Sequence, residues 1–180
     1  MSLEIDSRIE KYLSNSLQGL NLLYSAKLYG QMLVLLYSCI DAMGLLDAPP
    51  SQIKATGDSF KNWVKKYMLG DPRINFNELD FWAARCAVLH TFTSQSDLSN
   101  DNKAKELQYY AGAKDSPQAK LFAFTTPLID GGKHIPVHIE DTYLVFLKAL
   151  KTFCHQLTTN CKNDQAYEKR LNKVLQMFSL

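Results

Sequence analysis

The stretch MLVLLYSCIDAMGLL, residues 32–46, decides the fold of this chain. It is the most apolar run in the sequence, yet it is too short to span a bilayer and it carries the carboxylate of Asp41. Apolar residues occur on nearly every side of a helix drawn through residues 22–46, and such a helix is contacted from several directions. We therefore expect a buried helix at the centre of a bundle.

The flanking segments predict further helices. Residues 5–20 repeat apolar side chains at helical spacing, and the pattern resumes at 59–69 after the breaking stretch DAPPSQIKATGD. Another helix is expected around DFWAARCAVLHTF, residues 80–92, with Asn77 or Asp80 as its N-terminal cap. Helical spacing returns from residue 140 to the end of the chain.

Residues 106–139 follow a different pattern. ELQYYAG, AKLFAFTT and KHIPVHI are short and rich in aromatic or β-branched residues, and turn-like segments separate them. They predict a small antiparallel sheet or hairpin. The expected fold is therefore mainly α, a helical bundle with a small antiparallel β insertion around residues 106–139. We expect one domain over residues 1–180, with a helical core at 3–92 and 140–178.

The composition is that of a soluble globular protein. Of the 180 residues 46% are hydrophobic and 21% charged, and the net charge of +2 is too small to indicate a nucleic-acid-binding protein by itself. The four cysteines show no paired CxxC spacing, which favours reduced thiols over disulfides or zinc. The N-terminus has no apolar signal-peptide core, so we expect a cytoplasmic protein without a membrane segment.

Metal and nucleophile sites find little support. On a strand, His134 and His138 would lie about 13 Å apart, too far to share an ion, and Pro136 argues against a helix. No glycine-rich phosphate loop and no GxSxG motif occurs. Cys86 and His90 are four residues apart, but the apolar neighbours of Cys86 favour an inert thiol. We expect no metal and no cofactor.

Two sets of basic residues allow two interpretations each. Lys61, Lys65 and Lys66 alternate with aromatic residues and could follow a phosphate backbone, although a solvated helix face explains them equally well. Arg85 and His90 are five residues apart, about 140° of rotation and about 7.5 Å of rise on a helix, so they do not share one face. In a purely structural interpretation Arg85 pairs with an acid such as Asp41 or Asp80, and His90 caps the helix.

The motif RCAVLH, residues 85–90, and the HTFTSQSDLS that begins at His90 resemble the HEPN superfamily, named for higher eukaryotes and prokaryotes nucleotide-binding. The segments YSCIDAMGLL and FKNWVKKYM precede the motif in the same order, so the resemblance covers roughly residues 24–98. It implies a metal-independent endoribonuclease, a toxin or defence effector that acts as a homodimer. Arg85 would hold the scissile phosphate and His90 would be the general acid or base, leaving a 2′,3′-cyclic phosphate.

The resemblance also brings supporting residues and alternatives. Active members often carry Asn, Asp or His directly after the arginine, where this chain has Cys86. The carboxylate of Asp41 is a candidate to orient Arg85, because a buried acid needs a cationic or donor partner. The expected partners are a second copy of the chain, RNA as substrate and an antitoxin protein. The alternatives are a non-catalytic HEPN-like module that binds nucleotide, RNA or a protein, and a helical scaffold in which both residues are structural.

Overall fold

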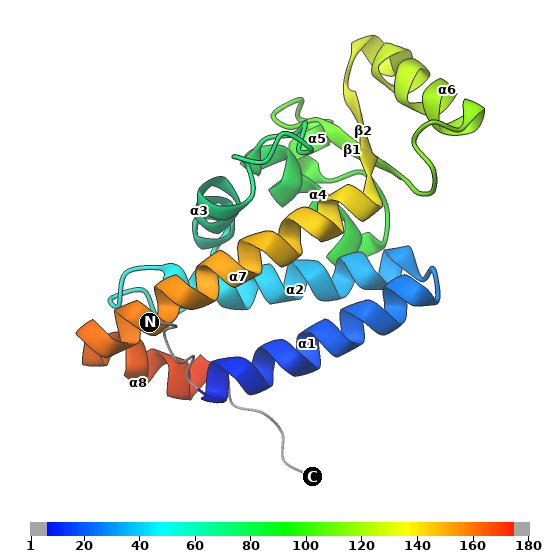
Figure 1. The fold of residues 1–180 in the computed structure, drawn as a ribbon. Coiled ribbons are helices and arrows are strands. Elements are labelled where there is room, and N and C mark those ends of the chain that lie inside the picture. Colours follow the sequence, from blue (N-terminus) through cyan, green and yellow to red (C-terminus); the bar gives the residue numbers. More distant parts are fainter. Residues whose placement is uncertain (1–6, 175–180) are drawn as a thin grey trace. The chain divides into compact units, whose positions relative to one another are not determined.

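The structure, a computed structural model, describes residues 7–174 and is mainly α-helical, as predicted (Figure 1). The expected helical residues 3–6 and 175–178 lie outside the described residues. The described chain divides into two compact units, residues 7–63 with 149–174 and residues 64–148. The elements are α1 (Ser7–Ser25), α2 (Tyr29–Asp47), α3 (Gly57–Tyr67), α4 (Glu78–Thr91), α5 (Asp97–Asn100), β1 (Glu106–Tyr110), α6 (Pro117–Thr125), the 3₁₀ helix η1 (Thr126–Gly131), β2 (His134–His138), α7 (Ile139–Asn163) and α8 (Gln165–Val174).

In the first unit α1 and α2 form an antiparallel hairpin (Figure 1). The apolar run from residue 22 is not one helix, because α1 continues to Ser25 and Lys27 then takes a left-handed conformation with φ 57°. The central part of the prediction holds: nine residues of α2 are buried, and Met32, Leu36 and Met43 are among its fully enclosed side chains.

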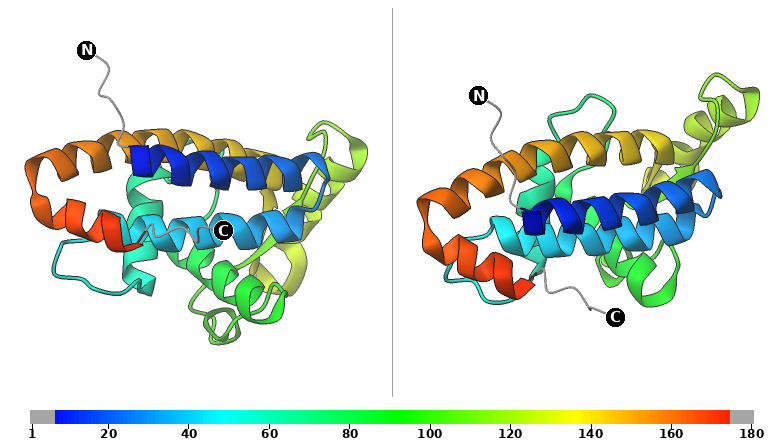
Figure 2. Two further views of the ribbon diagram at one scale, coloured as in Figure 1. Left: turned by 90° about the horizontal axis from the view of Figure 1, so that it is seen from below. Right: turned by 60° about the horizontal axis from the view of Figure 1, so that its bottom comes forward.

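Besides α1, helices α3 and α8 also contact α2 within this unit. The ring of Tyr37 lies 6.2 Å from that of Phe60 on α3, and the backbone at Gly44 approaches that of Ser59. At the C-terminal end of α2, Arg170 of α8 donates to the carbonyl oxygens of Leu45 at 2.8 Å, Ala48 at 2.5 Å and Pro49. Figure 2 shows α8 beside this end of α2 in both views. Arg170 thus satisfies carbonyl groups that a helix end leaves without partners.

Among the described helices, α2 is the one that is long and apolar enough to cross a membrane by length and composition. Half of its most apolar window is buried inside the protein, and the core helix of a soluble protein passes the same test. The burial of α2 is therefore consistent with a soluble protein.

In the second unit β1 and β2 pair in parallel, with Glu106 opposite His134 and Tyr110 opposite His138. The prediction of an antiparallel insertion was wrong in this respect. The segment AKLFAFTT is not a strand either: it belongs to α6, which starts at Pro117 after Ser116 accepts a hydrogen bond from the N–H of Ala119. Parallel strands need a long crossover connection, and α6 with η1 supplies it.

Candidate functional site

The predicted site residues Arg85 and His90 lie on α4, whose N-terminus is fixed by a capping box. The side chain of Asn77 accepts from the N–H groups of Leu79 and Asp80, both at 2.9 Å. The Asp80 carboxylate accepts from the Asn77 N–H at 3.1 Å in return. Both candidate caps named from the sequence therefore act together.

Asp80 also connects α4 to the strand pair. It is only 3% exposed, and its second carboxylate oxygen accepts from the N–H of Lys105 at 2.8 Å, directly before β1. Since a buried carboxylate needs such donors, Asp80 has a structural role of its own at the start of both elements.

The C-terminus of α4 is closed by Phe92 and not by His90. Phe92 adopts the left-handed conformation with φ 55°, and its N–H donates to the carbonyls of Ala87 and Val88. Thr91 Oγ1 donates to the Ala87 carbonyl at 2.9 Å. His90 is therefore a helical residue in the last turn, and the interpretation of His90 as the helix cap was wrong.

Arg85 is half-buried beside an aromatic ring. Its guanidinium carbon lies 4.9 Å from the centroid of Trp82, one turn earlier on α4. A cation over an aromatic face at this distance is attracted by the ring and loses side-chain freedom. Arg85 is thus oriented by its own helix, while its planar group keeps the donor geometry suited to a phosphate.

His90 is exposed, and the regular helix separates it from Arg85 around the axis. Because α4 is helical from Glu78 to Thr91, the five-residue spacing keeps its rotation of about 140°. One copy of α4 therefore does not present both side chains on one face.

The supporting residues are distributed over both units. Cys86 is half-buried on α4. Asp41 is half-buried on α2 in the first unit, so its predicted action on Arg85 stays a prediction. On α3, Lys61 pairs with Asp58 at 2.9 Å, whereas Lys65 and Lys66 are exposed. Their RNA-binding role also stays a prediction.

A pocket of about 160 Å³ lies between α4 and β1. It borders the face of α4 that carries Ala84 and Val88, next to the motif residues, and its other lining residues are Thr93, Ser94, Leu107, Gln108 and Tyr109. The sequence alone gave no sign of this pocket, because its two sides come from segments about 20 residues apart that belong to different elements.

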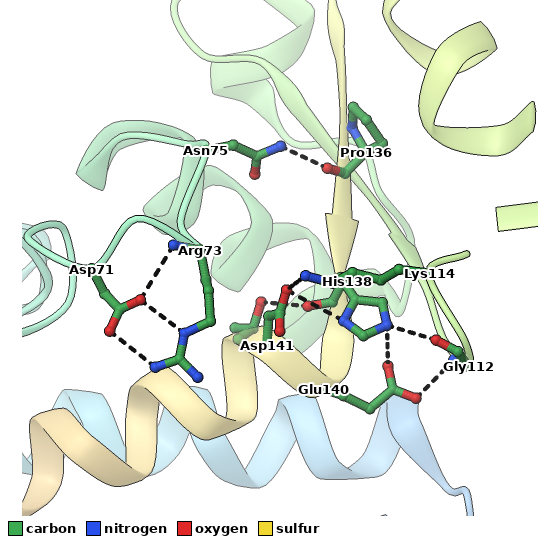
Figure 3. A network of polar contacts seen from close by, with 10 residues as sticks. Asp71, Arg73, Asn75, Gly112, Lys114, Pro136, His138, Glu140 and Asp141 are labelled. Carbon is green, nitrogen blue, oxygen red and sulfur yellow. Dashed lines mark hydrogen bonds and ion pairs between the residues drawn. The ribbon is translucent and has the colours of Figure 1, made fainter. Parts of the chain in front are cut away.

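A network of polar contacts surrounds the end of β2 (Figure 3). His138 Nε2 lies 2.8 Å from the Gly112 carbonyl oxygen and 3.1 Å from Glu140 Oε2, and His138 Nδ1 lies 3.4 Å from Asp141 Oδ2. The Gly112 N–H donates to Glu140 Oε1 at 2.7 Å, and Lys114 pairs with Asp141. The network joins the loop after β1 to the junction of β2 and α7.

This network holds the backbone and is largely buried. The side chains of His138, Glu140 and Asp141 are only 11–14% exposed, and the ring of Tyr110 lies 5.1 Å from that of His138. Because they are largely buried and bind the backbone at Gly112, we assign them a structural role. The signal in the sequence was the succession of His138, Glu140 and Asp141 at the predicted strand end.

His134, the other histidine of β2, has partners of its own. His134 lies 3.5 Å from Glu106 and 3.4 Å from Asp130, and its Nδ1 is 3.2 Å from the Gln108 amide nitrogen. His134 and His138 both lie on the strand β2, as expected from the sequence. Within residues 7–174 no group of three or more His, Cys, Asp or Glu side chains has a metal-binding arrangement.

A third polar cluster lies before α4. Asp71 accepts from Arg73 at 2.8 and 2.9 Å and from Lys148 at 3.1 Å (Figure 3 shows the pair with Arg73). The hydrogen bonds from Arg73, helped by Lys148, hold the pKa of Asp71 well below its usual range. The cluster fixes the turn that leads from α3 to α4.

In comparisons with known proteins, no family model, no curated protein and no solved structure matches the chain.

Proposed function

We propose that this protein is a cytoplasmic, metal-independent endoribonuclease of the HEPN type that acts as a homodimer. The observation that carries the proposal is the RCAVLH motif on α4, with Arg85 oriented by the Trp82 ring and an exposed His90 five residues later. These are the two groups to which the resemblance assigns phosphate binding and proton transfer.

The reaction needs only these groups and the RNA itself. His90 would remove the proton from a ribose 2′-hydroxyl, whose oxygen attacks the adjacent phosphorus. The bond from phosphorus to the 5′-oxygen breaks, and that oxygen takes up a proton from water, to which His90 returns the proton it removed. Arg85 would neutralise the charge that builds up on the non-bridging oxygens. The products are a 2′,3′-cyclic phosphate and a 5′-hydroxyl.

Two chains are required because of the helix geometry. A straight α4 keeps Arg85 and His90 about 140° apart, whereas two copies of α4 related by a two-fold axis can bring one of each together. Lys65 and Lys66 of α3 are exposed and would follow the RNA backbone. If the protein is a toxin, a cognate antitoxin would cover the same surface.

The test is cleavage of a fluorogenic RNA in EDTA by the wild type, Arg85→Ala and His90→Ala. Loss of a general acid or base lowers the rate by about 10²–10⁴-fold, so both variants should lose at least about a hundredfold. His155→Ala is the matched control, because His155 is equally exposed but lies on α7. Equal rates for all four proteins would contradict the assignment.

A mixing experiment tests the composite site separately. If each site takes Arg85 from one chain and His90 from the other, a heterodimer of the two alanine variants retains one intact site of two. Random exchange of subunits should then restore roughly a quarter of the wild-type rate. Cleavage by the wild type without any recovery on mixing would place both residues in the same chain's site. Binding of RNA without cleavage would favour the non-catalytic HEPN-like module instead.

A further inference from the structure

The end of α6 and the start of η1 expose four large apolar side chains. Leu121 is 64% exposed, Phe124 72%, Leu128 68% and Ile129 51%. They fall within nine consecutive residues, LFAFTTPLI, that carry no charge. Single exposed apolar residues are ordinary on a protein surface, whereas a group of them in one place marks an interaction surface. We call these four residues the α6 patch.

The α6 patch lies on the side of its helix that faces away from the strands. Helical conformation continues from α6 into η1 as far as the residue before Ile129. The inner side of α6 holds Ala119, which is buried, and Phe122, whose ring lies 5.3 Å from that of Tyr110 on β1. At about 100° per residue, the first three residues of the α6 patch lie on the side of the helix roughly opposite to these two. Folding of this unit therefore leaves the α6 patch uncovered.

The area of the α6 patch matches one half of a homodimer interface. With about 200 Å² for a fully exposed large apolar residue, the four side chains expose roughly 500 Å². A stable interface of standard size buries about 800 Å² on each partner, and homodimer interfaces are about 65% apolar, which is also roughly 500 Å². A second copy of the same patch would therefore supply the other half.

Opposite charges close the two ends of the α6 patch. Lys120 precedes it and is exposed, and Asp130 follows it with a side chain that is 70% exposed although it lies 3.4 Å from His134. An antiparallel pairing about a two-fold axis places Lys120 of each copy opposite Asp130 of the other. A parallel pairing would bring like charges together, and an anionic lipid surface would repel Asp130. The charges therefore favour a second copy in antiparallel orientation.

We propose that the α6 patch is a two-fold interface through which two copies of this chain associate. Phe124 is the most exposed of the four side chains and lies in the middle of the helical part of the patch, where binding energy is concentrated in such interfaces. The inference goes beyond the proposed ribonuclease function, because the association requires neither Arg85 nor His90.

The test is the mass of the full-length protein in sedimentation equilibrium over a range of micromolar concentrations. The wild type should be a dimer or a larger assembly. Phe124→Glu should at least halve this mass and raise the dissociation constant at least about a hundredfold, because a two-fold interface loses the aromatic side chain twice. Ile53→Glu is the matched control: Ile53 is 78% exposed and lies outside the α6 patch, so this variant should keep the wild-type mass.

A pair of charge variants tests the antiparallel orientation. Lys120→Glu places like charges at both ends of the interface and should raise the dissociation constant at least about fivefold. Adding Asp130→Asn removes this repulsion and should restore part of the affinity, and asparagine tolerates the left-handed conformation of residue 130, with φ 47°. Circular dichroism shows whether the variants are folded. Because Lys120 is exposed, Lys120→Glu carries the test if Phe124→Glu does not fold.

The outcomes separate this interface from the ribonuclease proposal. A monomeric wild type would overturn the interface, and flotation of that monomer with vesicles of anionic phospholipid would assign the α6 patch to a lipid surface instead. A folded Phe124→Glu protein that keeps the wild-type mass would overturn it as well. Arg85→Ala and His90→Ala should keep the wild-type mass, so a loss of RNA cleavage in these two variants concerns the ribonuclease alone.

Discussion

Replacing Gly44 with alanine should destabilise the protein although alanine favours helices. Gly44 is a buried residue on α2, at the position where this helix approaches the backbone at the start of α3. A Cβ at Gly44 would lie 2.6 Å from the carbonyl oxygen and 2.9 Å from the carbonyl carbon of Ser59. These are backbone atoms, so no side-chain rotation can relieve the contact.

The magnitude follows from two opposing terms. Alanine in place of glycine within a helix contributes about 1 kcal/mol of stability. Overpacking a filled interior costs about 1–3 kcal/mol, and a backbone obstacle puts Gly44→Ala at the upper end of this range. We expect the free energy of unfolding to fall by about 2 kcal/mol, which lowers the Tm by about 4–8 °C for a protein of this size.

Gly19→Ala is the matched control. Gly19 lies on α1, and its added Cβ would be 3.1 Å from Leu35 Cδ2, the end of a flexible side chain. Leu35 can move by a few tenths of an ångström, so the helix propensity should dominate and leave the stability unchanged or raised by up to about 1 kcal/mol. The same substitution should therefore have opposite consequences on adjacent helices.

The assay is urea unfolding followed by far-ultraviolet circular dichroism, with midpoints and slopes compared for the wild type and both variants. A Gly44→Ala protein at least as stable as Gly19→Ala would refute the close approach of α2 and α3. A changed slope together with a lower midpoint would indicate that the variant also loosens the native state.

Three further predictions concern other parts of the chain. Asp71→Asn should lower the Tm at pH 7 and should make the Tm fall less steeply below pH 4 in thermal melts. The pKa of Asp71 is depressed in the folded protein, so its carboxylate stabilises the fold above the unfolded-state pKa of about 4 and stabilises it less as the pH falls. A Tm that falls as steeply below pH 4 as in the wild type would contradict this. Arg170→Met should lower the free energy of unfolding by about 2–4 kcal/mol by leaving carbonyls of the α2 end without donors, while Lys169→Met, at an exposed neighbour, should change it by less than about 0.5 kcal/mol in the same urea assay. Cys86→Asn should raise the rate of RNA cleavage, because an amide is a better hydrogen-bonding group for a phosphate than a thiol, and a slower variant would argue against this position in the site.

The sequence alone determined the features that depend on local interactions. The apolar run at 32–46 predicted the buried helix α2, because burying such a surface is the main favourable term in folding. Asn77 and Asp80 were recognisable as caps, since both act on N–H groups within three residues. The RCAVLH motif and its position near the end of a helix could also be found in this way.

Local signals were insufficient in the insertion. AKLFAFTT is mainly apolar, and over so short a run periodicity does not separate a strand from a helix. Ser116 and Pro117 start a helix there, and this helix is the crossover that makes β1 and β2 parallel. Strand direction depends on the connection between the strands, which their own residues do not encode.

Only the tertiary structure decided the surroundings of the candidate site. Asp80 reaches the backbone at Lys105, 25 residues later, and so sets β1 beside α4. This placement creates the pocket that Ala84 and Val88 of α4 line together with Leu107 of β1. The sequence could point to Arg85 and His90 as candidate residues because both lie on one predicted helix. It could not supply the pocket, because a cavity exists only between elements that folding brings together.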